Sequence, residues 1–403
     1  MSQALLLAST PLLMRLYTPS AFGDLANFMA ILGVFGVIAS FRMELAIGPE
    51  APSKVPELAT TCRKIVFFNT TILSVVLFAL DCLDRLPGIY WLLAPCLLMT
   101  GLIQIYTLIF LRIEYTNILA FFKILQTLTL LGAQFILYNQ LESGLIIGVV
   151  IGMSFFWFAF ELLKPSQFSY QKKSTFFNDI SRNSNFLKYS APGALISTLG
   201  MHLPIFAFMV TFSSEIVGLF AVALRLIMAP LGIVSQAITK ILIADAYLMT
   251  NFNKRREIFK RVMNIQYPIA FLALTGVLLA NDGLLRFVGL EDWSRSLPYI
   301  SIVLPWAIAS FFGSPLLGYL EVSEGQKEVL IFHGAMFVIR TAVLISAVNY
   351  LDPIHAAFAF AMTSTAIWCA LVLKLKKNHT AESLLFLLLI LTSIAISMRS
   401  LSY

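Results

Sequence analysis

The chain has 403 residues, of which 59% are hydrophobic and only 12% are charged, with a formal net charge of +7. An ordinary soluble protein is about 45 to 50% apolar and about 25% charged. This composition and a mean hydropathy of +0.85 therefore exclude a soluble enzyme or binding domain, and they predict an all-α integral membrane protein.

Apolar windows follow one another along the whole chain, separated by short polar breaks. Because a bilayer core needs about 20 apolar residues per helix, these windows predict about 12 to 13 transmembrane helices. The windows are 2–16, 24–47, 58–80, 89–111, 117–138, 144–163, 186–211, 215–247, 263–280, 297–320, 329–348, 354–375 and 382–398. The first window is short and is not typical of a signal peptide. It leaves open whether the N-terminus is complete.

The basic residues predict the orientation. If the windows cross the membrane alternately, 19 of the 28 Lys and Arg residues fall in breaks on the side of the N-terminus, and only 5 fall in breaks on the opposite side. The positive-inside rule then places the N-terminus in the cytoplasm. The run "NKRREIFKR" (253–261) is a cytoplasmic anchor in this interpretation, and no nucleic-acid partner is expected.

The longest basic break divides the windows into six before it and seven after it, of which the last forms an extra helix. It predicts an N-terminal helical lobe (1–163), a cytoplasmic linker (164–188), a C-terminal helical lobe (189–375) and an extra C-terminal helix (376–403). Each lobe carries a similar turn, "TPSAFGDLA" (18–26) and "SSEIVGLFA" (213–221), in which Gly23 aligns with Gly218. A parallel repeat would leave such a likeness, although two turns can also be alike by chance.

Arg42 and Glu44 interrupt the second window in "SFRMELAI" (40–47). On one helix they would lie about 200 degrees apart, so they could not neutralise each other side by side. Arg42 can be an anchor that extends to the nearby interface, or it can line a cavity. Glu44 is the only acidic residue well inside the early windows, which makes it a candidate for ion coupling.

Three further polar residues lie deep in the later windows. Arg225 is about 15 Å from the end of its window, too far for its side chain to reach water along the bilayer normal. A guanidinium at mid-depth costs at least about 2.5 to 3.5 kcal/mol, so it usually faces a cavity or a partner. Arg340 is similarly deep, and His202 is either a packing residue or a binding residue. Because these deep charges are mainly cationic, they favour an anionic, phosphate-bearing ligand.

Several stretches resemble one known family. They are "LLMRLYTPSAFGDLANF" (12–28), "SFRMELAI" (40–47), "GLIIGVVIG" (144–152), "FLKYSAPGALISTLGMHLPIF" (186–206) and "VGLFAVALRLIMAPLGIVSQAI" (217–238). Together they resemble the polysaccharide-biosynthesis exporters, the O-antigen or lipid-linked-oligosaccharide flippases of the multidrug/oligosaccharidyl-lipid/polysaccharide superfamily. Arg42 and Arg225 match that family's positions for cationic cavity residues, whereas Arg340 and His202 are assigned from their depth alone.

The resemblance implies two six-helix lobes around a central cavity. It also implies alternating access that moves an undecaprenyl-diphosphate-linked oligosaccharide, such as a lipopolysaccharide O-antigen unit, across a bacterial inner membrane. The implied partners are this polyprenyl-linked substrate, membrane lipids, a coupling cation (proton or sodium) and polysaccharide polymerase machinery. Windows one and seven carry no acidic residue, although drug-exporting relatives commonly place a coupling carboxylate there.

Two other functions stay open. A cation-coupled multidrug exporter of the same superfamily is the main alternative, and a membrane enzyme acting on lipid-linked sugars is a weaker one. No HExxH, GxSxG or GxxxxGK[ST] motif is present, and the longest outer break spans only residues 281–297. The four cysteines and four histidines have no metal-ligand spacing, so neither a metal nor a cofactor is expected.

Overall fold

The computed structural model describes residues 2–84, 87–141, 143–163, 176–184, 186–246, 252–322, 326–375 and 380–402. Most of the predicted linker, and the side chains of the basic run 253–261, lie outside this description. Within it, every regular element is a helix, and eleven helices are long and apolar enough to cross a membrane. The prediction of an all-α membrane protein is confirmed.

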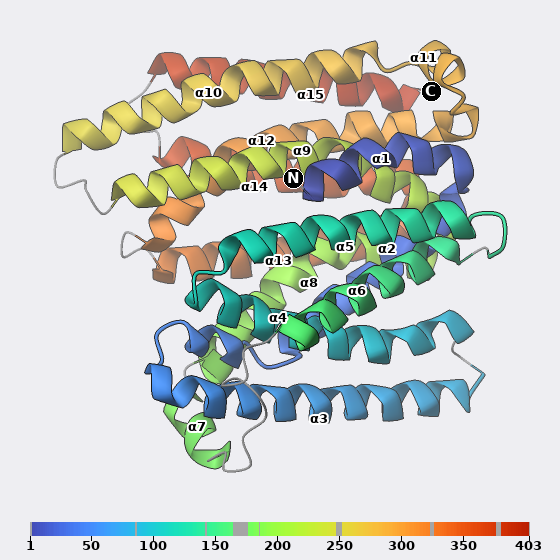
Figure 1. Cartoon of the computed structure of the whole chain (residues 1–403). Helices are drawn as coiled ribbons and strands as arrows, with labels where there is room; N and C mark the ends of the chain where they lie inside the picture. Colours follow the sequence, from blue (N-terminus) through green and yellow to red (C-terminus); the bar gives the residue numbers. More distant parts are fainter. Residues whose placement is uncertain are drawn as a thin grey trace. The chain divides into compact units, whose positions relative to one another are not determined.

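Each of the thirteen apolar windows contains a long helix, although the helix in the second window, 24–47, ends at Ile38 (Figure 1). These helices are α1 (Ser2–Leu16), α2 (Pro19–Ile38), α3 (Val55–Asp81), α4 (Leu93–Arg112), α5 (Thr116–Leu137), α6 (Gly144–Leu163), α8 (Ala191–Thr211), α9 (Ser214–Ala246), α10 (Phe252–Leu279), α12 (Leu297–Val322), α13 (Gln326–Tyr350), α14 (Pro353–Leu375) and α15 (Thr380–Arg399). Two short helices, α7 (Phe176–Arg182) and α11 (Asp282–Val288), follow polar breaks. Helices α1 and α15 are not among the eleven candidate spans.

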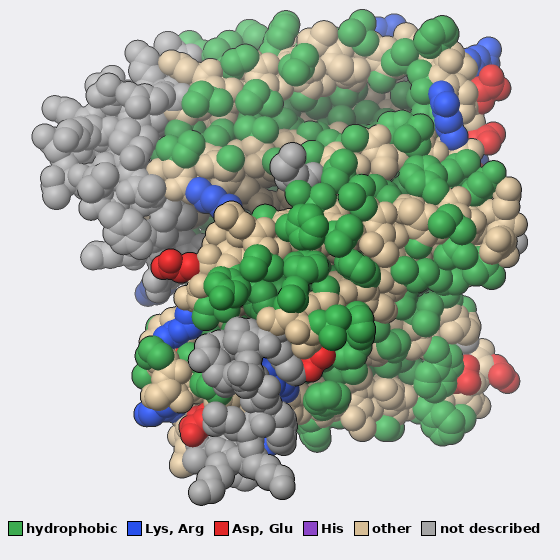
Figure 2. Space-filling view, viewed as in Figure 1, with side chains coloured by type: hydrophobic (Ala, Val, Ile, Leu, Met, Phe, Trp, Pro, Cys, Tyr) green, Lys and Arg blue, Asp and Glu red, His purple; other side chains and the backbone are tan. Residues whose placement is uncertain are grey.

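Contacts divide the chain into two compact units. The N-terminal unit comprises Met1–Ser9 and Asp24–Met201, and the C-terminal unit comprises Thr10–Gly23 and His202–Tyr403. The first turn of α2 therefore belongs to the C-terminal unit, and the rest of α2 belongs to the N-terminal unit. Hydrophobic side chains cover much of the face seen in Figure 2. Such exposed apolar surface is expected for helices that face lipid.

In the N-terminal unit, α5 and α6 pack closely along a face of glycines. A Cβ atom on Gly148 would lie 2.4 Å from the Gln134 Cγ, and one on Gly152 would lie 2.7 Å from the Leu130 Cβ. Gln134 is buried and donates a hydrogen bond from Nε2 to the Leu145 carbonyl, at 2.9 Å. The glycines of α6, which are four residues apart in the sequence, thus allow α5 and α6 to approach closely, as small residues do in other membrane helices.

We expect Gly148→Leu to destabilise the N-terminal unit. The added side chain would displace Gln134 and would also meet the Leu130 carbonyl, which belongs to the backbone and cannot rotate away. Overpacking of this kind costs about 1 to 3 kcal/mol. Thermal unfolding of the purified protein in detergent measures the effect. Gly132→Leu on α5 is the matched control, because a Cβ atom there meets nothing within 4 Å, and equal loss in both variants would contradict the packing argument.

Helix α12 lies at the centre of the C-terminal unit. It contacts α9, α10, α13, α14 and α15, and it is the most deeply buried of the eleven candidate spans. A helix that is apolar all round is expected to be buried on every side. Pro305 and Pro315 interrupt its backbone hydrogen bonding without ending the helix.

The first turns of α2 and α9 meet within the C-terminal unit. A Cβ atom on Gly23 would lie 1.9 Å from the Ser214 carbonyl oxygen, and one on Gly218 would lie 1.7 Å from the Pro19 carbonyl oxygen. Each glycine therefore faces the residue four positions before the other glycine. The two turns that are similar in sequence are thus in direct and reciprocal contact.

Candidate functional site

The polar interruption of the second window breaks the helix, which the sequence analysis did not predict. Helix α2 ends at Ile38, and a short 3-10 helix covers Met43–Ile47. Between them, Phe41 and Arg42 have φ angles of 51° and 58°, in the left-handed region that is costly for residues with a side chain. The prediction of one continuous helix over 24–47 is wrong, and so is the helical angle between Arg42 and Glu44 that was derived from it.

Side chains from α3 and α4 satisfy the open end of α2. Asn69 donates from Nδ2 to the carbonyl oxygens of Ile38, at 2.8 Å, and Ala39, at 3.0 Å. Gln104 donates from Nε2 to the Gly36 carbonyl oxygen, at 3.3 Å. These bonds supply partners for carbonyls that a helix end leaves unpaired. Broken helices at membrane depth are typical of ligand and ion sites in transporters.

Arg42 and Glu44 have separate neighbours at this break. The half-buried Arg42 donates from Nε to the Ser190 Oγ at 3.2 Å, and no described carboxylate forms an ion pair with it. Glu44 is buried and accepts a hydrogen bond from the Ser40 hydroxyl. The guanidinium of Arg42 therefore keeps donors for a further acceptor, and Glu44 is a carboxyl group with a single described hydrogen-bond partner.

A second polar cluster, which was not predicted from the sequence, lies in the N-terminal unit. Arg63 is buried on α3, with its guanidinium carbon 5.3 Å from the centre of the Tyr106 ring. The Tyr106 hydroxyl donates to a carboxylate oxygen of Glu161 on α6. Arg63 was counted among the basic residues of the break before the third window, although it lies inside that window, 58–80. Since α3 begins at Val55, Arg63 lies more than two turns inside the helix.

Arg112 stabilises the segment that follows the break. Its guanidinium donates to the carbonyl oxygens of Ile47, Gly48 and Glu50, with the Gly48 contact at 2.6 Å. A planar guanidinium with five donors suits such a set of acceptors. Arg112 is one of the basic residues that predicted the membrane orientation, and its contacts thus give it a structural role as well.

The remaining candidates lie in the C-terminal unit. Arg225 is partly exposed on α9, eleven residues after the first residue of that helix, and it has an interaction partner there. At 1.5 Å per residue this corresponds to about 16 Å along the helix axis, which agrees with the depth predicted from sequence. His202 is half-buried on α8, with its ring 6.4 Å from the Phe206 ring. The structure places both residues within apolar helices.

Arg340 lies in an aromatic environment inside the C-terminal unit. Its side chain on α13 is 4% exposed, and its guanidinium carbon lies 5.1 Å from the Trp306 ring centre and 5.4 Å from the Phe360 ring centre. Attraction to the ring faces offsets part of the cost of burying the charge. Nε and Nη2 nevertheless have no hydrogen-bond partner among the described residues, which is costly for a charged donor.

Comparison with known proteins gives a fold but no sequence family. No protein-family model matches the chain, and no curated protein sequence matches it. Solved structures match over nearly its whole length. The eleven candidate spans, the broken helix and the deep arginines thus belong to an all-α membrane protein that shares its fold with solved transporter structures.

Three of the matching solved structures show which fold this is. The lipid II flippase MurJ in an inward closed conformation is 14% identical, with a TM-score of 0.75 over 100% of this chain and 96% of that chain. An inward-facing multidrug resistance MATE transporter of the MOP superfamily is also 14% identical, with a TM-score of 0.68 over 95% of each chain. A MOP superfamily transporter from Pyrococcus furiosus has a TM-score of 0.59 at 14% identity, over 94% of this chain and 96% of that chain.

Proposed function

We propose that this chain is a flippase. In this proposal it moves an undecaprenyl-diphosphate-linked oligosaccharide, an O-antigen or another surface polysaccharide repeat unit, across a bacterial inner membrane by alternating access, with its N-terminus in the cytoplasm. The fold shared with a lipid II flippase over the whole chain supports the class of substrate. The substrate's diphosphate is the group that buried arginines suit best.

The observation that carries the proposal is Arg42. It lies at a break in an apolar helix, where the left-handed backbone is strained, and no described carboxylate neutralises it. A cation in such a place is expensive unless it binds something. The proposal assigns Arg42 and Arg225 to the diphosphate, with His202 and Arg340 as further substrate-binding residues. Glu44 is the proposed site of coupling to a proton or sodium ion.

Alanine at Arg42 or Arg225 is expected to reduce export of surface polysaccharide by about tenfold or more. A charge-assisted hydrogen bond contributes about 1.5 to 3 kcal/mol, and each 1.4 kcal/mol is a factor of ten. The measurement is surface polysaccharide in cells whose only copy of this gene carries the variant. Lipid-linked oligosaccharide should accumulate in the membrane of the same cells.

Arg295→Ala is the matched control for this experiment. Arg295 pairs with Glu215 in the C-terminal unit, and its side chain is 65% exposed, so its loss should leave export unchanged. Membrane insertion of each variant is measured separately by immunoblot of the membrane fraction. Normal export by both Arg42→Ala and Arg225→Ala, at normal protein levels, would refute the assignment of these residues.

A cation-coupled multidrug exporter is the second candidate, favoured by the fold shared with a MATE transporter and by the buried Glu44. The two functions differ in what Glu44→Gln should change. A multidrug exporter would show lower resistance to cationic dyes in this variant. The flippase would show lower polysaccharide export with unchanged dye resistance.

A further inference from the structure

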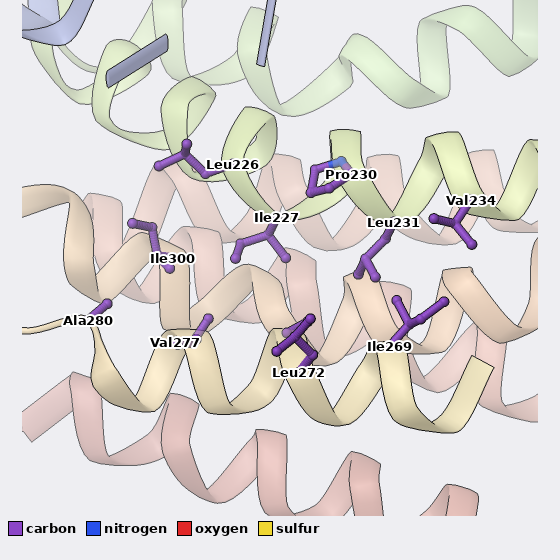
Figure 3. Close-up of a pocket in the computed structure, with 12 residues that line it drawn as sticks. Leu226, Ile227, Pro230, Leu231, Val234, Ile269, Leu272, Val277, Ala280 and Ile300 are labelled. Carbon is purple, nitrogen blue, oxygen red and sulfur yellow. The ribbon is translucent and has the colours of Figure 1, made fainter. Parts of the chain in front are cut away.

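An apolar groove runs between α9 and α10 in the C-terminal unit (Figure 3). It has a volume of about 390 Å³. Leu226, Pro230 and Val234 of α9 line one side, and Ile269 and Val277 of α10 lie across from them. Arg225 is about 170 degrees around α9 from the centre of this lining, since successive residues turn by about 100 degrees, so the groove is distinct from the proposed substrate site.

A second cavity of about 450 Å³, more polar than the groove and called the polar cavity below, adjoins the groove at the end of α10. The two share Val277 and Ala280 in their walls. Asp282 and Arg399, which carry opposite charges, line the polar cavity together with Ser294 and Ser301. The groove is therefore lined by apolar residues, and the adjoining cavity is lined by one acidic residue, one basic residue and hydroxyl groups.

The helices place these two parts at different membrane depths. The apolar candidate span of α10 ends at Leu279, so Asp282 follows just beyond it, and Arg399 is the last residue of α15. The neighbouring helix α11 exposes 91% of Phe287, as expected for a short helix at the membrane surface. The polar cavity thus lies at head-group depth.

The apolar groove has the length of one lipid leaflet. It extends along α10 from Ile269 to Ala280, which is eleven residues or about 16 Å at 1.5 Å per residue. Half of a hydrocarbon core about 30 Å thick is about 15 Å. One acyl chain of a phospholipid would fill this length, whereas a long polyprenyl chain would extend far beyond it.

We propose that the groove holds one phosphatidylethanolamine molecule, with one acyl chain between α9 and α10 and the head group in the polar cavity. Arg399 faces the phosphate and Asp282 faces the primary ammonium group. The opposite charges of these two side chains match a zwitterionic head group better than an anionic one. The inference does not depend on the proposed flippase function, because binding is measured on the protein without any transport.

Native mass spectrometry of the delipidated full-length protein tests this proposal. The probes are phosphatidylethanolamine, phosphatidylcholine and phosphatidylglycerol with identical acyl chains, and a polyprenyl phosphate. We expect one phosphatidylethanolamine per chain, bound more tightly than the other probes. In Asp282→Asn, binding of phosphatidylethanolamine should fall to the level of phosphatidylcholine.

Gly276→Leu fills the apolar groove. A Cβ atom at Gly276 meets nothing within 4 Å, so the leucine should fit without strain and should displace several methylene groups of the acyl chain. Binding should weaken by about tenfold or more. Gly334→Leu on α13 is the matched control, because its Cβ atom also meets nothing within 4 Å and it lies outside the groove.

Three results would overturn the proposal. The first is equal lipid binding by Gly276→Leu and Gly334→Leu. The second is that the wild-type protein binds phosphatidylglycerol or polyprenyl phosphate more tightly than phosphatidylethanolamine. The third is that no stable lipid adduct forms at all. If Gly276→Leu does not accumulate, Leu272→Trp narrows the same groove from α10. The comparison of head groups on the wild-type protein decides the question without either variant.

Discussion

Gly23→Ala and Gly218→Ala are each expected to lower the thermal stability of the protein strongly. The new methyl group would lie 1.9 Å or 1.7 Å from a carbonyl oxygen of the facing turn, far inside van der Waals contact. Because the obstacle is backbone, the first turns of α2 and α9 would have to separate. Overpacking that side-chain movement cannot relieve costs about 3 kcal/mol or more. Thermal unfolding in detergent and the amount of protein in the membrane measure this effect.

Gly232→Ala on α9 is the control for these two variants. A Cβ atom there meets nothing within 4 Å, and alanine is a better helix former than glycine, so stability should stay equal or rise slightly. Once one substitution has separated the turns, the other should cause little further loss of stability. The double variant Gly23→Ala/Gly218→Ala should therefore lose less than the sum of the single losses. Additive losses would show that the two glycines do not share one contact.

Arg340→Met is expected to make the protein more stable and its transport weaker. Methionine fits the aromatic environment of Trp306 and Phe360 and removes two buried donors that have no described partner. Replacement even of a buried ion pair by apolar residues of similar volume is often neutral, or it stabilises a protein by about 1 to 4 kcal/mol. The unfolding temperature should rise while polysaccharide export falls, if Arg340 binds substrate as proposed.

Arg340→Lys separates charge from shape at the same position. Lysine keeps the positive charge, but it lacks the planar group that stacks on rings and it is more strongly hydrated, so its burial should cost more. We expect this variant to be less stable than both the wild type and Arg340→Met. A lower unfolding temperature for Arg340→Met than for the wild type would mean that the arginine has a structural partner that stabilises the fold.

Helix positions could be predicted from the sequence because lipid imposes a simple rule. Each crossing needs an apolar segment, and each of the thirteen predicted segments contains a helix, although the helix in 24–47 ends at Ile38. The four-residue spacing of the α6 glycines places them on one face of the helix. In the structure, Gly148 on this face lies close to Gln134 of α5.

The detailed geometry around Arg42 could not be predicted in this way. An apolar window does not show where a helix ends if side chains from other helices donate hydrogen bonds to its last carbonyl oxygens. Here the donors are Asn69 of α3 and Gln104 of α4. Arg63 was missed for a related reason. It was counted with the basic residues of the preceding break although it lies inside the window 58–80, and its contact with Tyr106 is long-range in sequence.

The reciprocal contact of Gly23 and Gly218 bears on the origin of the chain. In a symmetric dimer of identical subunits, residue i of one copy meets residue j of the other, and j meets i. The same relation holds here, because Pro19 meets Gly218 and Ser214 meets Gly23. Each of these two residues lies four positions before the glycine of its own turn. If a half-length ancestor formed such a dimer, its glycine turn would have met its own copy, and duplication and fusion of the gene would have preserved the contact within a single polypeptide.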